Sequence, residues 1–270
     1  MKKSSSVLRL VEGALLIAVG AVLSMVKLLD LPYGGSVTAC SALPVLLIGY
    51  RHGVKFGVFA AFVYSLLQLL LGMNTLSYFT TPLSIIAIIL LDYVLAFAVL
   101  GLGGIFRREG RSQGQALVLA ALLTCALRYV CHVISGCTVW AGLSIPTEAA
   151  LVYSLAYNAT YMLPETLVTV LGAWYLSRGL DVGGERISRS STAEVSGRAF
   201  GLSLCAKGAA AIAVIADIVL IFRHLQDAQT GDFIITGLAN VQWLTVGIVS
   251  VVGAALFAVL TLLARTENKK

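Results

Sequence analysis

The sequence predicts an all-α polytopic membrane protein with a six-helix body and two additional transmembrane helices. Of its 270 residues, 59% are hydrophobic and only 12% are charged, whereas a soluble domain is close to half apolar and a quarter charged. Several apolar runs reach the roughly 20 residues that a helix needs to cross the hydrocarbon core of a bilayer. A polar stretch separates the last two of these runs from the others.

The membrane segments can be placed along the chain in order. Residues 7–29 follow basic residues, as a signal peptide would, but the run is long and has no small-residue cleavage pattern before Asp30, so we expect a retained first helix. The further segments are predicted at 41–71, 83–106, 115–141, 147–177, 199–224 and 234–264. Residues 41–71 are too long for one crossing and contain the charged turn YRHGVKFG, which predicts a short helix, 41–51, and a longer one, 54–71.

The basic residues predict the topology. With the N-terminus inside, all of the 19 Lys and Arg residues except Lys27, Arg128 and Arg223 fall on the inner side. The loops 30–40, 72–82 and 142–146 contain neither residue type. Because positive charge concentrates on cytoplasmic loops, we expect both termini in the cytoplasm. The net charge of +6 is therefore a topology signal and not evidence for nucleic-acid binding.

The domain organisation follows from the polar stretch RGLDVGGERISRSSTAEVSGR. Its glycines, serines and charges predict a cytoplasmic linker over residues 178–198. The linker would divide a substrate-binding membrane body, residues 1–177, from a two-helix membrane tail, residues 199–270, whose role the sequence does not indicate.

Catalytic and metal chemistry find little support in the sequence. The five cysteines form no C-x-x-C pair and suit apolar packing. There is no Walker A motif, and GLGGIF at 101–106 ends a membrane helix and follows no strand, which disfavours a nucleotide site. We therefore predict that the chain is not an enzyme and binds no metal and no cofactor of its own.

Polar residues within the membrane segments predict a binding cup. Counting inward at about 1.5 Å per residue places Asp92, His132 and Asn158 at a common depth, roughly 15 Å below the outer surface. Trp140 lies near the top, Tyr153 a little deeper, and Tyr78 in the loop above. Ionisable residues inside a membrane usually face a cavity or a partner. The pattern thus predicts an outward-open pocket with a polar floor and an aromatic wall.

Each residue of the cup also allows a structural interpretation. Asp92 would be a counter-charge for a cationic ligand or a partner for Arg128. His132 would hydrogen-bond a heterocycle or a neighbouring helix. Trp140 would stack on a flat ring or face a cation, or it would lie at the membrane interface as belt tryptophans do.

Arg128 and Gly136 complete the candidates on the same segment. Arg128 lies twelve residues from Trp140, roughly 18 Å along a helix, so a small ligand is not expected to touch both unless the arginine stretches upward. An ion pair of Arg128 with Glu165 or Asp92 beneath the pocket is the alternative. Gly136 removes a side chain where a ring or a neighbouring helix would approach.

These residues resemble the thiamine-specific substrate-binding (S) component of energy-coupling-factor (ECF) transporters, the ThiT family, over about residues 7–180. The resemblance rests on VEGALLIAVGAVLSM, LPYGGSVTACSALPVLLIGYRHGVKFG, LDYVLAFAVLGLGGIF, RYVCHVISGCTVWAG and YSLAYNATYMLPE. It implies a six-helix S-component body with an extracellular vitamin pocket that the first loop covers. The implied ligand contacts are Asp92, Tyr93, Arg128, His132, Gly136, Trp140, Tyr153 and Asn158, with Tyr78 as a further match.

The resemblance also implies partners and a location. Ala14 and Ala18 match the small-x-x-x-small surface with which S components dock on a shared transmembrane coupling subunit, and such spacing permits close helix contact in lipid. That subunit couples to two cytoplasmic ATPases, so ATP would be used by the partners and not bound by this chain. The implied location is the cell membrane of a prokaryote.

Three positions depart from the family pattern. Asp92 stands where the pocket acid is typically glutamate, Arg128 where the basic residue is typically lysine, and the first loop offers Tyr33 and no tryptophan. The leading hypothesis is therefore capture of thiamine or a close analogue. The alternatives are an S component for another heterocyclic vitamin or a thiamine precursor, an autonomous ion-coupled carrier in which Asp92, Arg128 and Glu165 form the relay, and a purely structural membrane protein.

Overall fold

The computed structural model describes residues 6–31, 34–141, 149–190, 197–225 and 234–267. It divides into two compact units, Met1–Ser190 and Ser191–Lys270, and each is described by itself. Among the described residues, six helices are long and apolar enough to cross a membrane, and they lie in both units. The chain is thus a multi-pass, all-α membrane protein, as predicted.

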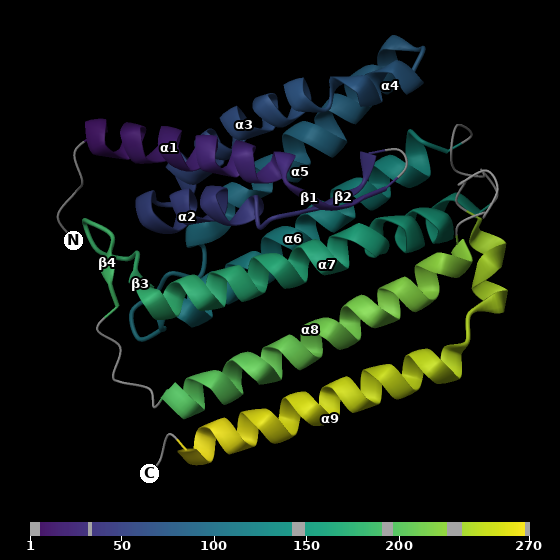
Figure 1. Ribbon diagram of the computed structural model, residues 1–270. Helices are drawn as coiled ribbons and strands as arrows, with labels where there is room; N and C mark the ends of the chain where they lie inside the picture. The colour runs from purple at the N-terminus through teal and green to yellow at the C-terminus, as the bar shows by residue number, and fades with distance from the viewer. Residues whose placement is uncertain (1–5, 32–33, 142–148, 191–196, 226–233, 268–270) are drawn as a thin grey trace. The chain divides into compact units, whose positions relative to one another are not determined.

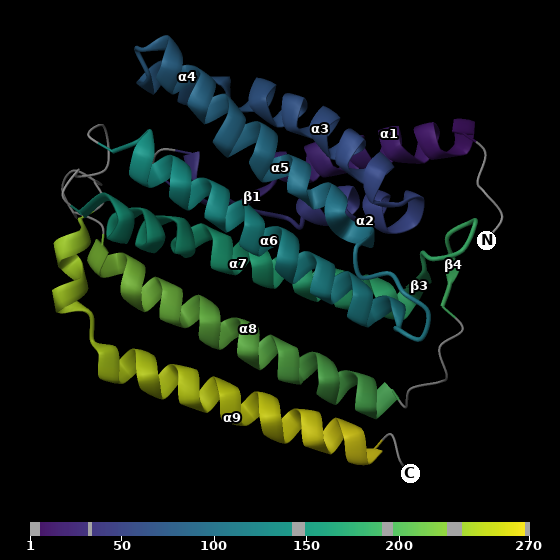
Figure 2. The ribbon, with the colours of Figure 1, turned by 180° about the vertical axis from the view of Figure 1, so that it is seen from behind.

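The first unit is a bundle of helical rods (Figure 1, with the opposite face in Figure 2). The long helices are α1 (Ser6–Met25), α3 (Val54–Leu71), α6 (Gln113–Thr138) and α7 (Ala150–Gly179), and α2 (Ala42–His52) is shorter. A further rod joins α4 (Pro82–Ile88), the π-helical η3 (Ile89–Leu95), α5 (Ala96–Ala98) and the 3₁₀ segment η4 (Val99–Gly104). The 3₁₀ helix η2 (Met73–Tyr78) precedes this rod.

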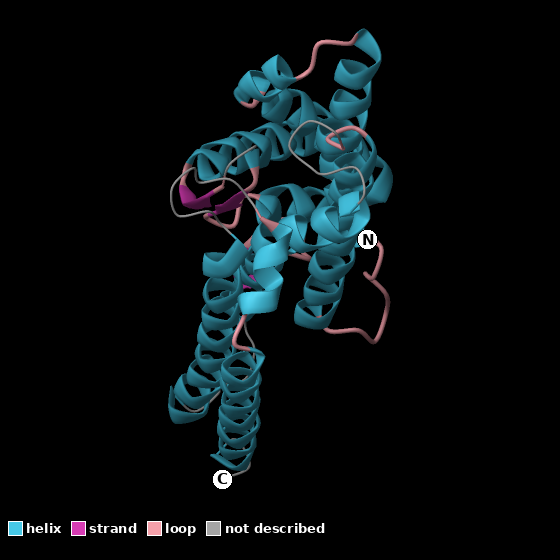
Figure 3. Ribbon diagram, turned by 90° about the vertical axis from the view of Figure 1, so that its right-hand side faces the viewer, coloured by secondary structure: helices cyan, strands magenta, loops and turns pink. Residues whose placement is uncertain are grey.

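Strands occur only as two short hairpins in the described residues (Figure 3). In the first hairpin, β1 (Lys27–Asp30) pairs antiparallel with β2 (Ser36–Thr38), and Lys27 lies opposite Thr38. In the second, β3 (Leu180–Asp181) pairs with β4 (Ser188–Arg189). The prediction that the first helix continues to residue 29 was wrong, because the chain leaves the helix after Met25 and its backbone groups pair with β2 instead.

The break between α2 and α3 was predicted correctly. Gly53, with φ of 90°, caps α2 and precedes α3, and this conformation is easy only for glycine. All residues of α2 from Ala42 to Tyr50 are buried. Four of them, Leu43, Leu46, Leu47 and Tyr50, pack in a core cluster with α6 residues such as Leu117 and with Ala173 of α7. Helix α2 is therefore the apolar centre of the bundle, although it is only 11 residues long.

Glycines let the central rods touch backbone to backbone. A Cβ atom on Gly103 of η4 would lie 1.8 Å from the carbonyl oxygen of Leu46 in α2. A Cβ on Gly49 or on Gly57 would lie 2.2 or 2.4 Å from the carbonyl oxygen of Gly101. The sequence disfavours a nucleotide site at the stretch GLGG. In the structure, these glycines allow η4 to cross α2 and α3 at close range.

The second unit is a helical hairpin of α8 (Gly197–Leu225) and α9 (Trp243–Glu267), with the 3₁₀ helix η6 (Ile235–Asn240) between them. The helices approach closely where Gly253 faces Ala213, and Ser250 donates a hydrogen bond to Asp217 at 2.6 Å. The prediction of one continuous helix over 234–264 was wrong, because extended backbone at Val241 separates η6 from α9.

Candidate functional site

One end of the first unit holds a cavity of about 460 Å³. Its wall combines the end of α1, the first hairpin and its turn, α3, η3, α6 and α7. Eight of the residues predicted as ligand contacts line it together: Asp92, Tyr93, Arg128, His132, Gly136, Trp140, Tyr153 and Asn158. Three separate helical rods thus bring their candidate residues to one space, which spacing along the sequence alone does not establish.

Asp92 is the polar centre of this cavity. It lies in η3, and π-helical turns inside helical rods are frequent at functional sites. One carboxylate oxygen lies 2.9 Å from Nδ1 of His132, and the other accepts hydrogen bonds from Ser135 at 2.7 Å and from Nε1 of Trp140 at 3.2 Å. The predicted wall and floor are therefore joined directly, since the wall tryptophan donates to the floor carboxylate.

Asn158 is held rigidly on α7. Its amide nitrogen donates to the Ser154 hydroxyl at 3.0 Å and to the His132 carbonyl at 3.3 Å, and its oxygen accepts from the Tyr161 hydroxyl at 2.5 Å. A Cβ atom on Gly136 would lie 2.1 Å from the hydroxyl oxygen of Ser154. Gly136 therefore makes room for α7, which is the second of the two roles that the sequence left open for it.

Aromatic rings surround the mouth of the cavity. Trp140 is 8% exposed, and its ring packs edge-on against Phe79 with centroids 4.7 Å apart. Tyr78 is 50% exposed and does not line the cavity, although its ring centroid lies 5.9 Å from that of Trp140. The structure thus places Tyr78 behind the tryptophan, where it supports the wall.

Two further predicted tyrosines form part of the wall itself. Tyr93 follows Asp92 in η3, and its hydroxyl donates to the Gly72 carbonyl at 2.9 Å, which ties this rod to the end of α3. Tyr153 on α7 is 3% exposed and lines the same cavity.

Arg128 lines the cavity without the ion pair that the sequence suggested. No ion pair within 4.0 Å joins it to Asp92 or Glu165 in the described part of the chain. Its guanidinium lies over the Phe97 ring, 4.6 Å from the centroid, and its buried Nε has no hydrogen-bond partner there. The cavity extends along α6 and reaches both Arg128 and Trp140, and contact of one small ligand with both side chains stays a prediction.

Glu165 anchors the first hairpin to α7. This carboxylate is 2% exposed and accepts hydrogen bonds from the backbone nitrogen and the hydroxyl of Thr38, at 2.7 and 2.8 Å. The Thr38 hydroxyl also lies 2.7 Å from that of Ser41. Thr38 and Ser41 line the cavity, but nothing in their sequence surroundings distinguishes them from loop residues. Sequence reasoning identified Glu165 only as a possible partner of Arg128 and missed this contact.

The turn of the hairpin also contributes to the cavity. Gly34, Gly35, Ser36 and Lys27 line it, with the Lys27 ammonium 3.0 Å from Asp30. A Cβ on Gly35 would lie 2.7 Å from the Tyr161 ring, so the glycine lets the turn approach α7. Tyr33, the loop aromatic singled out from the sequence, lies outside the described residues.

The two predicted docking residues lie on α1. Ala14 and Ala18 are both exposed on α1, whereas Gly13 and Gly20 on the same helix are buried. In the described parts of the chain, no group of three His, Cys, Asp or Glu side chains is arranged to hold a metal ion.

A helical membrane bundle with carboxylates and aromatic rings around a cavity of this size is the arrangement of a protein that binds a small polar molecule. Comparisons with known proteins identify the family to which this binding protein belongs. The chain belongs to the thiamine transporter protein family (Thia_YuaJ), whose sequence model matches residues 10–181.

Two relatives agree with this assignment. The thiamine transporter ThiT of Bacillus subtilis (strain 168) is 33% identical over 182 residues, which are 63% of this chain and 91% of that protein. The solved structure of ThiT from Listeria monocytogenes superimposes with a TM-score of 0.52 at 24% identity, over 63% of this chain and 93% of that one, and shows the same fold. The hairpin of α8 and α9 lies beyond the matched residues 10–181.

Proposed function

We propose that the chain is the substrate-capturing S component of an ECF importer. It binds thiamine in an outward-facing cavity and delivers it to a transmembrane coupling subunit that two cytoplasmic ATPases drive. Both termini would lie in the cytoplasm of a prokaryotic cell. The role is non-catalytic, and the chain needs no metal or cofactor of its own, because ATP is used by the partners.

The observation that carries this proposal is the Asp92 carboxylate among aromatic side chains. Thiamine combines a permanent thiazolium cation with a flat aminopyrimidine ring. Trp140 offers a face to either ring, and Asn158 and Arg128 offer polar groups to ring nitrogens. The charged side chains that line the cavity are two carboxylates, Asp92 and Glu165, and two cations, Arg128 and Lys27, and the Lys27 ammonium is paired with Asp30.

The proposal is tested by titrating purified protein with thiamine, a pyrimidine precursor of thiamine and an unrelated vitamin. We expect submicromolar binding of thiamine and weaker binding of the others. Tight binding of another vitamin with none of thiamine would refute the specificity. In proteoliposomes, we expect uptake only when the coupling subunit and ATPases are present, and uptake by the lone chain would instead identify an autonomous carrier.

The Arg128 geometry gives a prediction about its contribution to binding. Because Arg128 is paired with neither carboxylate, Arg128→Ala leaves no buried anion without its partner. A hydrogen bond from a charged group is worth about 1.5–3 kcal/mol, so we expect this change to weaken thiamine binding at least about tenfold. The effect should equal or exceed that of Trp140→Ala.

Calorimetric titration of both variants measures this comparison, with Arg128→Lys as the conservative control. The lysine variant is expected to retain most of the affinity, since it keeps the charge. Unchanged thiamine affinity in Arg128→Ala would show that the guanidinium only packs on Phe97.

A further inference from the structure

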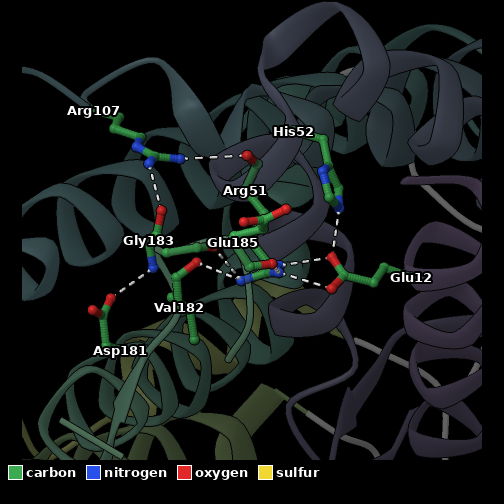
Figure 4. A network of polar contacts seen from close by, with 9 residues as sticks. Glu12, Arg51, His52, Arg107, Asp181, Val182, Gly183 and Glu185 are labelled. Carbon is green, nitrogen blue, oxygen red and sulfur yellow. Dashed lines mark hydrogen bonds and ion pairs between the residues drawn. The ribbon is translucent and has the colours of Figure 1, made fainter. Parts of the chain in front are cut away.

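A second polar cluster lies outside the cavity and joins α1 to the rest of the first unit (Figure 4). Glu12 of α1 faces Arg51 and His52 at the end of α2. Glu12 precedes the cavity residue Ser24 by twelve positions, roughly 18 Å along the helix. The cluster is therefore separate from the cavity, and ligand binding in the cavity does not account for it.

Glu12 is held by two basic side chains. Arg51 donates from Nη2 to one carboxylate oxygen at 2.8 Å and from Nε to the other at 3.0 Å, and Nε2 of His52 lies 2.8 Å from the second oxygen. The side chains of Arg51 and His52 are only 3% and 4% exposed, and that of Glu12 is 19% exposed. A forked arginine–carboxylate pair fixes orientation as well as distance.

The same arginine ties Glu12 to the segment after α7. Arg51 donates to the carbonyl of Val182 at 2.7 Å and to that of Glu185 at 3.3 Å. Arg107 donates to the carbonyls of Tyr50 and Gly183, at 2.8 and 2.7 Å. Four parts of the chain that are far apart in sequence thus meet at one point, which we call the Glu12 clamp: Glu12, Arg51, His52 and Arg107 with residues 182–185.

Helix α1 also packs against the bundle through Leu16, Ile17 and Ala21, and its Gly20 carbonyl accepts a hydrogen bond from the Tyr64 hydroxyl at 3.3 Å. Only Gly13 and Gly20 of its residues are buried, while apolar side chains such as Leu15 and Val22 are more than half exposed. At its far end, Gln68 donates to the Ser24 hydroxyl at 2.9 Å, beside the cavity. The Glu12 clamp is the polar attachment of this helix near its N-terminal end, and Gln68 supplies another at the cavity end.

We propose that Glu12 is a positioning residue for partner docking. It holds α1 so that Ala14 and Ala18 face outward, two and six residues beyond Glu12 on the same helix. This inference rests on the proposed function, because the face that it positions is the one expected to meet the coupling subunit. It assigns to Glu12 a role in delivery that is separate from ligand capture in the cavity.

The test compares Glu12→Gln with Glu109→Gln, the same change at an exposed acid of the first unit that takes no part in the clamp. In Glu12→Gln we expect partner-dependent thiamine uptake to fall about tenfold, within the range of coupling changes reported for residues outside binding sites. The thiamine dissociation constant of the isolated chain should change less than about twofold. Glu12→Asp, which keeps the charge, should recover part of the uptake, and Glu109→Gln should match the unmodified chain.

Hydrogen–deuterium exchange supplies a readout that needs no partner. In Glu12→Gln we expect faster exchange in the first turns of α1 and unchanged exchange in α6. If uptake and α1 exchange both stay at their original values, the inference is wrong. If thiamine binding is lost or α6 also exchanges faster, Glu12 is a general stabiliser and the inference is equally overturned. If the unmodified chain binds no thiamine, the proposed function fails, and the exchange of α1 still decides whether Glu12 positions that helix.

Discussion

We expect Asp92→Asn to weaken thiamine binding about 100-fold, because a unit charge near a cation in a partly buried site contributes several kcal/mol. Asparagine has the shape of aspartate and can keep the surrounding hydrogen bonds. Its oxygen would accept from Ser135 and Trp140, and its amide would donate to His132 in the other tautomer. The variant therefore removes the charge and leaves the architecture in place.

Isothermal titration with two ligands measures this effect. The loss should be large for thiamine and small for a neutral pyrimidine precursor that lacks the thiazolium. Asp92→Glu is the matched control, since it retains the charge and restores the acid that is typical of the family. Equal losses for the charged and neutral ligands would show that Asp92 acts only by orienting His132 and Trp140.

The second large effect is expected from Gly103→Ala. The new Cβ atom would lie 1.8 Å from the backbone oxygen of Leu46, and a backbone atom cannot move aside as a flexible side chain can. Overpacking of a tight core costs about 1–3 kcal/mol and sometimes more. We expect the upper end of this range, a fall of roughly 10 °C in the midpoint of thermal unfolding.

Scanning fluorimetry of the detergent-solubilised protein checks the prediction. The control is Gly208→Ala on α8, where an added Cβ meets nothing within 4 Å. That change should leave the midpoint unaltered or raise it slightly, since alanine favours a helix over glycine. Equal midpoints for the two variants would contradict the backbone crossing of α2 and η4.

The helical rods could be predicted because each apolar run is long enough to be read without knowledge of its neighbours. The break at Gly53 carried its own local signal, a charged glycine turn. The hairpin at Lys27–Thr38 had no such signal, because its two strands are only four and three residues long. Its pairing depends on the Glu165 anchor, 127 positions further along the chain.

The candidate site was likewise predictable only where its features depend on a single helix. Depth counting correctly grouped Asp92, His132 and Asn158, since axial position follows directly from the helical rise. It left the role of Arg128 open, because the extent of a cavity along a helix depends on the side chains of other rods. The partners of Asp92 were also beyond reach, since they depend on how two rods are rotated about their axes.

The π-helical turn around Asp92 has a consequence for how this family can vary. An added or removed residue within a helix rotates everything beyond it by about 100°. The π-helical segment 89–95 contains the cavity residue Asp92 and precedes the glycine crossing at 101–104, so its extra residue sets the rotation of Asp92 about the rod axis relative to that crossing. A one-residue deletion there would leave Asp92 and the glycines at 101–104 in the sequence. It would still rotate either Asp92 away from the cavity or the glycines away from their contacts with α2 and α3. The length of this segment should therefore be under as strong a selection as its chemistry, and natural relatives should tolerate substitutions in it far more readily than gaps.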